Sequence, residues 1–230
     1  MVVAGVLGGA RSGYNCREPL HSEGLKMIRP AGLASDLVTV DEFFALVPDG
    51  QKADLIDGVI YMASPDSHRA STLTKMITVM LDGYVAAKQV GGDVNGSRFA
   101  YILSPIRAPE PDVAYIAPER MHLLRDRAMQ GGPDIAVEIV SRDSKRRDYH
   151  EKRELYRNAG TREYWIIDPI KKAALFLLLR DGEYHPAELE DGHIFRSTVL
   201  PGFWIDAAWL FAEPLPSGYD CLQKILASNH

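Results

Sequence analysis

Two carboxylate residues stand inside apolar segments whose composition is typical of buried strands. Asp112 opens the segment 112–116 directly after Pro111, and Glu138 lies within the segment 134–140. A charge inside a buried strand is costly unless it pairs with an opposite charge or binds a metal. Two such residues on successive strands therefore indicate a site for a divalent cation. The chemistry that such a site favours is phosphodiester hydrolysis.

The alternation of side chains along a strand predicts the surroundings of each carboxylate. Glu138 shares a face with Ala136 and Val140, and the other face carries Ile135, Val137 and Ile139. If the two strands are neighbours, Asp112 and Glu138 lie side by side. The alternative is a structural carboxylate that accepts a backbone N–H or pairs with an arginine, and this alternative fits Asp112 better than Glu138.

The segment after Glu138 predicts a third participant, Lys152. A polar loop covers residues 141–148, and a helix is expected from about residue 148 to residue 158, where Gly160 stops it. One face of this helix carries Lys152, Leu155, Tyr156 and Ala159. The apolar members need the core, so Lys152 turns toward the sheet. Its ammonium is then aimed at the carboxylate pair, where it orients water or stabilises phosphate charge, or it snorkels at the rim of the apolar stripe.

Three arginines of the same region, Arg146, Arg147 and Arg153, are candidates for contact with a phosphate backbone. The alternative for each is a solvated basic loop.

Length and composition favour one enzyme domain over residues 35–230, preceded by a flexible segment 1–34 that has no hydrophobic period. The chain of 230 residues is 46% hydrophobic and 25% charged, with a net charge of −5. This charge is not that of a protein coated by nucleic acid, but it leaves room for a nuclease with local basic loops. Cys16 and Cys221 form no Cys-x-x-Cys pair, and no apolar run approaches the roughly 20 residues of a membrane span. We therefore expect a cytoplasmic protein with no membrane partner.

Local signals along the chain predict an α/β fold with a mixed central sheet. Thr39 and Glu42 form a capping box before a short helix, and Asp57-Gly58 is a strong hairpin signal between residues 53–56 and 59–62. A long helix begins near Ser67 and ends before Gly91-Gly92. The remaining segments predict strands, a β-meander and a short final helix at 99–103, 112–116, 135–140, 163–168, 173–179, 183–195 and after 206.

A set of short motifs follows in a characteristic order. The set consists of Ala53-Asp54-Leu55-Ile56-Asp57-Gly58, Ser64-Pro65 with His68, Pro111-Asp112-Val113, Val137-Glu138-Ile139-Val140-Ser141, Glu151-Lys152-Arg153, Tyr156 with Gly160, and Glu163-Tyr164-Trp165-Ile166-Ile167-Asp168-Pro169. In this order the motifs resemble the Uma-type endonuclease family of the PD-(D/E)XK, restriction-endonuclease-like superfamily, over about residues 36–212.

The resemblance implies a restriction-endonuclease-like mixed sheet flanked by helices, with an N-terminal hairpin and a C-terminal β-meander. It also implies a magnesium-dependent nuclease site, with Mn²⁺ as a substitute, and nucleic acid as the substrate, for which we expect DNA. By motif, Asp112 and Glu138 are the metal ligands. Val140 stands where the superfamily has its lysine, so Lys152 of the next helix is expected to replace it. Asp54 stands at the family's usual glutamate and reaches the metal through water. A homodimer is the expected assembly for paired cutting.

Two further residues carry open alternatives. Asp54 is either part of the site or a solvated aspartate at the start of a strand. His68, in the first turn of a helix, caps that helix, bridges to Asp66, or leans into the site as a proton carrier or phosphate contact. Ser64 with His68 does not indicate a serine hydrolase, because no Gly-x-Ser-x-Gly motif is present. The alternative function is a catalytically inactive nucleic-acid-binding or regulatory module on the same scaffold.

Overall fold

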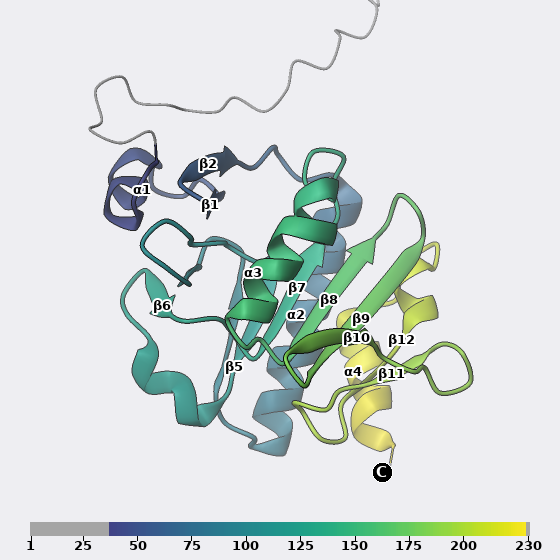
Figure 1. Cartoon of the computed structure of the whole chain (residues 1–230). Coiled ribbons are helices and arrows are strands. Elements are labelled where there is room, and N and C mark those ends of the chain that lie inside the picture. Colours follow the sequence, from purple (N-terminus) through teal and green to yellow (C-terminus); the bar gives the residue numbers. More distant parts are fainter. Residues whose placement is uncertain (1–36, 229–230) are drawn as a thin grey trace, which may run out of the picture.

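The computed structural model describes residues 37–228, so the prediction for residues 1–34 lies outside the described residues. A six-stranded sheet in the order β10-β9-β8-β7-β5-β3 forms its centre (Figure 1). Within this sheet only β7 and β8 pair in parallel, and the other neighbouring strands are antiparallel. The strands are β3 (Asp93–Gly96), β5 (Val113–Ile116), β7 (Ile135–Ile139), β8 (Glu163–Asp168), β9 (Ala173–Arg180) and β10 (Glu183–Pro186). The predicted mixed α/β fold is confirmed.

Helices cover both faces of this sheet (Figure 1). The crossover between the parallel strands β7 and β8 contains α3 (Lys152–Asn158), which packs on one face through Tyr156. The long helix α2 (His68–Lys88) packs on the other face, and α4 (Gly218–Ala227) lies against α2. Gly83 permits this contact, since a Cβ there would lie 2.3 Å from Leu222 Cδ2.

The predicted alternation along β7 is confirmed. Ile135, Val137 and Ile139 belong to the core beneath α2, whereas Ala136 and Val140 belong to the smaller core beneath α3. Glu138 therefore faces the α3 side of the sheet. Because α3 begins at Lys152, the same face receives the first turn of that helix.

The N-terminal elements follow their local signals. At the start of α1 (Val40–Leu46) Thr39 N donates to Glu42 Oε2 at 2.8 Å, and Glu42 N donates to Thr39 Oγ1 at 3.4 Å, which completes the capping box. The hairpin of β1 (Ala53–Ile56) and β2 (Val59–Met62) turns at Asp57 and Gly58, whose φ angles are 49° and 74°. Positive φ at both turn residues is typical of the tightest hairpins.

Several elements differ from the local expectations. The strand expected at 99–103 is β4 (Ala100–Ile102), which pairs in parallel with β6 (Ala128–Gln130) outside the central sheet. The edge strand β3 was not expected, because its sequence Asp-Val-Asn-Gly is polar and only pairing with β5 extends it. After β10 the chain leaves the sheet, and β11 (Ile194–Arg196) pairs with β12 (Trp204–Asp206).

The other short elements are two 3₁₀ helices, at Pro118–Leu123 and Ala207–Phe211, and one π-helical turn at Arg147–Glu151 that leads into α3. No helix within residues 37–228 has both the length and the apolar character needed to cross a membrane.

Candidate active site

A cavity of about 420 Å³ opens where the β1–β2 hairpin, the start of α2, the end of β7 and the start of α3 meet. Its lining includes the four residues that the sequence placed in a catalytic role: Asp54, Asp112, Glu138 and Lys152. These residues come from four separate segments of the chain, so only the fold brings them together.

Asp112 and Glu138 lie on neighbouring segments of the sheet. The antiparallel register of β5 and β7 pairs Val113 with Val137, and Asp112 directly precedes β5. Asp112 N donates to Val137 O at 3.0 Å, and Asp112 Oδ2 accepts a hydrogen bond from Ile139 N at 2.6 Å. These contacts hold one oxygen of Asp112 against the sheet and leave the other to face the cavity.

Lys152 lies between two of the carboxylates. Its Nζ is 2.8 Å from Glu138 Oε1 and 2.9 Å from Asp54 Oδ2, and its side chain is only 2% exposed. Burial alone would lower the pKa of Lys152, but Asp54, Glu138 and Asp148 raise it above its ordinary value. The ammonium therefore stays protonated. In the structure Lys152 points toward the sheet and the carboxylates, as the sequence predicted.

A second lysine, Lys52, enters the site without having been predicted. Its Nζ is 2.5 Å from Asp112 Oδ1, and 18% of its side chain is exposed. Burial opposes the charged form, yet Asp112, Glu138 and Asp54 raise the pKa of Lys52 above its ordinary value. A signal for it was present in the sequence, because Lys52 stands two residues before Asp54 and so on the same face of an extended strand.

Asp148 is the other unpredicted member. The π-helical turn before α3 contains this residue, and its carboxylate is 1% exposed. Ser144 Oγ donates to Asp148 Oδ2, while Asp148 Oδ1 is 3.9 Å from Lys152 Nζ and has no hydrogen-bond partner in the described part of the chain. Burial raises the pKa of Asp148 to about 6.

The buried cluster holds more negative than positive groups. Four carboxyl groups (Asp54, Asp112, Glu138, Asp148) face two ammonium groups. Burial raises the pKa of Glu138 to about 8, although Lys152 opposes this rise. At Asp54 burial is outweighed, mainly by Lys152 and Lys52, and its pKa is lowered. The lysines thus stabilise the ionised form of Asp54, but they do not offset the effect of burial on Glu138 and Asp148.

This excess of buried oxygen donors fits a divalent cation, whose two charges would balance it. Hard cations such as Mg²⁺ bind carboxylate oxygens and usually keep several waters, with one or two carboxylates from the protein. Asp112 and Glu138 both line the cavity. Within residues 37–228, no three His, Cys, Asp or Glu side chains converge in a way that could hold a metal ion. Any ion held here would therefore complete its shell with water or substrate oxygen.

The other residues predicted to bind substrate lie at different distances from this cavity. Arg147 lines it, with its guanidinium 4.8 Å from the centre of the Tyr61 ring and its buried Nε without a hydrogen-bond partner among residues 37–228. His68 is exposed at the start of α2 and outside the lining. Arg146 pairs with Glu151, and Arg153 donates to Tyr184 O, so both also lie outside it.

Comparison with known proteins decides the family. The family model described as "Uma2: Putative restriction endonuclease" matches residues 40–208. The chain belongs to the Uma2 family. This membership indicates a nuclease, and it confirms the resemblance seen in the ordered motifs. No curated protein matches the chain.

A solved structure shares the fold of this Uma2 chain. It is described as a putative nuclease belonging to DUF820 from Anabaena variabilis ATCC 29413, and it matches with a TM-score of 0.63 at 16% sequence identity. The match covers 76% of this chain and 97% of that one. At this identity the likeness concerns the fold, and the site must be argued from the residues described above.

Proposed function

We propose that the chain is a metal-dependent endonuclease that hydrolyses phosphodiester bonds of nucleic acid, with DNA as the substrate. The observation that carries this proposal is the convergence of Asp54, Asp112 and Glu138 with two lysine ammonium groups in one cavity. The excess of buried carboxyl groups supports the metal, and the nuclease family supports the substrate class.

Asp112 and Glu138 would hold the ion, which we propose to be Mg²⁺ with Mn²⁺ as a substitute. When bound, such an ion polarises a phosphoryl oxygen and lowers the pKa of a coordinated water. Asp54 contributes a carboxylate that Lys152 holds in place, and the backbone N–H of Glu110 donates to its Oδ1 at 2.9 Å. This second hydrogen bond ties the hairpin strand β1 to the segment that leads into Asp112.

The two lysines have different electrostatic roles. Lys152 is almost completely buried and bridges Asp54 and Glu138, so it orients both carboxylates. Lys52 is more exposed and stands beside Asp112, so its ammonium is the one that faces an incoming phosphate. Both remain protonated, since their pKa values are raised, and both act by stabilising negative charge rather than by removing a proton.

Arg147 adds a guanidinium at the wall of the same cavity. Its stacking on Tyr61 fixes the guanidinium plane, and a guanidinium is a suitable donor for phosphate oxygens. We propose that His68, Arg146 and Arg153, which lie outside the lining, contact the flanking backbone of the strand instead. The homodimer and the cytoplasmic setting stay predictions from the sequence.

The test is a cleavage panel on single- and double-stranded DNA and RNA with Mg²⁺, Mn²⁺ or EDTA, together with metal titration by calorimetry. The double variant Asp112→Asn, Glu138→Gln should lose metal binding and cleavage and keep the fold. Asp191→Asn, an exposed turn residue with φ of 52°, is the matched control. Unchanged metal affinity in the double variant would refute the site. Nucleic-acid binding without cleavage anywhere in the panel would favour the inactive module.

A further inference from the structure

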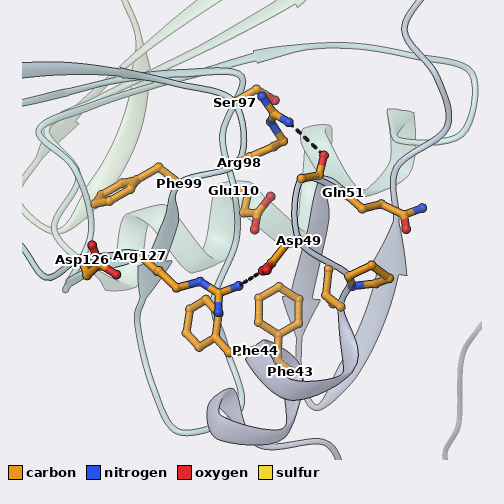
Figure 2. Close-up of a pocket in the computed structure, with 13 residues that line it drawn as sticks. Phe43, Phe44, Asp49, Gln51, Ser97, Arg98, Phe99, Glu110, Asp126 and Arg127 are labelled. Carbon is orange, nitrogen blue, oxygen red and sulfur yellow. Dashed lines mark hydrogen bonds and ion pairs between the residues drawn. The ribbon is translucent and has the colours of Figure 1, made fainter.

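A second cavity of about 370 Å³ lies beside the catalytic one, a size at which small-molecule sites occur. Figure 2 shows its walls: α1, the loop before β1, residues 97–99 and residues 126–127. None of the residues assigned to catalysis lines this cavity, so its composition calls for an explanation of its own.

Aromatic rings form much of the wall. Phe43 and Phe44 of α1 meet edge to face, with ring centroids 5.3 Å apart. Phe99 meets Tyr101 in the same manner at 5.6 Å, which fixes the plane of the Phe99 ring. Phe44 and Phe99 are only partly buried. Such ring faces favour a planar aromatic ligand that can stack.

One carboxyl group stands in the pocket among these rings. Glu110 is 5% exposed, and Figure 2 shows its side chain between Arg98 and the Phe43 ring. Glu110 Oε2 accepts a hydrogen bond from Ala53 N at 3.1 Å. Glu110 Oε1 has no hydrogen-bond partner among residues 37–228, and it is not one of the fully buried polar atoms there, so it is accessible from the cavity. A ligand that donates a hydrogen bond would satisfy this oxygen.

Two arginines frame the opening. Arg98 has a left-handed backbone, with φ of 75°, and its Nη1 donates to Gly50 O at 2.9 Å. The guanidinium of Arg127 lies 5.4 Å from the centre of the Phe44 ring and pairs with Asp49 at 3.0 Å. Both arginines keep further N–H groups for a phosphate. The pocket thus combines a stacking interior and one open acceptor with a charged rim, where Asp49 and Asp126 accompany the two arginines.

The pocket and the catalytic site share a wall. Glu110 N donates to Asp54 Oδ1, while the side chain of Glu110 accepts from Ala53 N in return. Leu55 and Ala108 exchange two further backbone hydrogen bonds of 3.1 and 2.8 Å. This pairing holds the wall between the two cavities in one arrangement.

We infer that this second cavity binds one nucleobase of the strand that occupies the catalytic site, and that it selects a base with an amino group. The inference rests on the proposed function. An amino group such as N4 of cytosine donates to Glu110 Oε1, a pairing that Glu side chains make with cytosine elsewhere. Burial raises the pKa of Glu110 to about 7. Above that pH thymine is disfavoured, because its only ring N–H is flanked by two carbonyl oxygens that would face the carboxylate. The aromatic rings stack on the base, and Arg98 and Arg127 contact the neighbouring phosphates.

The test is the binding of fluorescently labelled single strands of twelve deoxycytidines or twelve thymidines, measured by anisotropy with EDTA so that no cleavage occurs. The parent chain should bind the cytidine strand about tenfold more tightly, within the usual range for one base contact. Glu110→Gln should reverse this preference. Its amide oxygen would keep the hydrogen bond from Ala53 N and turn an N–H₂ group, which suits a thymine carbonyl, toward the ligand.

Stacking is tested separately by Phe99→Ala, which should weaken both strands about tenfold. Tyr219→Ala removes an exposed ring far along the chain, in α4, and should change neither affinity. If Glu110→Gln fails to fold, competition by dCMP and dTMP on the parent chain replaces it, and dCMP should compete more strongly. Equal binding of both strands, or equal competition, would overturn the inference, as would an unchanged affinity in Phe99→Ala.

Failure of this inference differs from failure of the proposed function. The double variant Asp112→Asn, Glu138→Gln should retain the preference for the cytidine strand, because neither residue lines the second cavity. Base preference without any metal-dependent cleavage would refute only the endonuclease. Cleavage without base preference would refute only the base pocket.

Discussion

The metal-free protein should lose stability as the pH rises, and Glu138→Gln should abolish this loss. In the folded protein burial raises the pKa of Glu138 from the ordinary 4.5 to about 8. Between these two values the folded state holds a proton that the unfolded state releases. The free energy of unfolding therefore falls as the pH rises through this window, and the loss is complete above the folded pKa.

The magnitude follows from the width of this window. Each pH unit corresponds to about 1.4 kcal/mol, so a shift from 4.5 to about 8 amounts to a loss of about 5 kcal/mol. That loss is a large part of the stability of an ordinary domain. A glutamine in this position is neutral at every pH, and its carbonyl oxygen still accepts the hydrogen bonds that Lys152 and Tyr156 donate to Glu138 Oε1. The variant therefore lacks this dependence and keeps the packing.

The assay is urea unfolding followed by circular dichroism at pH 5, 6, 7 and 8, with EDTA to exclude divalent ions. The stability of Glu138→Gln relative to the parent should grow by about 1.4 kcal/mol per pH unit over this range. Glu188→Gln, at an exposed position, is the control and should parallel the parent. Parallel profiles for Glu138→Gln and the parent would refute the assigned burial of this charge.

Two further predictions concern the lysines and a second buried glutamate. Lys152→Ala should lower the free energy of unfolding by about 3–5 kcal/mol, because the buried carboxylate of Asp54 and the carboxyl group of Glu138 lose their partner. Lys52→Ala should lower the free energy of unfolding by less than Lys152→Ala does, because Lys52 is more exposed and pairs with one carboxylate, and it should lower cleavage about 10²–10³-fold. Equal losses of stability in the two variants would contradict this division. Glu163→Ala should destabilise the fold by about 3–5 kcal/mol, since several donors lose their acceptor, without a change in metal affinity measured by calorimetry below the melting temperature. A fall in metal affinity would place Glu163 in the site.

The sequence does not distinguish the role of Glu138 from that of Glu163. Both stand in apolar strands and both are buried. The carboxylate of Glu163 accepts hydrogen bonds from Thr198 N, Val199 N and Trp165 Nε1, so it is a structural residue that fastens a loop to β8. The carboxylate of Glu138 faces a cavity and a lysine. The local pattern is the same in both cases, and only the partners differ.

The aspartates divide in the same way. Asp134 is 2% exposed, but it accepts a hydrogen bond from Ala117 N and pairs with Arg120 and Arg162. This is the structural alternative that the sequence left open for a buried carboxylate. Asp112 was the residue that fitted this alternative better. It does accept a backbone hydrogen bond, from Ile139 N, and it also lines the cavity. Ranking buried acids by their local sequence therefore does not separate the two roles.

The sequence by itself determined which face of β7 and of α3 is buried, because periodicity is a local property of the backbone. It thereby predicted that Glu138 and Lys152 point to the same side of the sheet. The two residues are 14 positions apart, which is a short connection between the strand and the helix that packs on it. The tertiary structure alone decided the contacts between distant segments. Lys52 and Asp112 are 60 residues apart, and Glu110 and Asp54 are 56 apart. No local period connects such pairs, since they depend on how the hairpin docks against the sheet. The second cavity depends on the same docking.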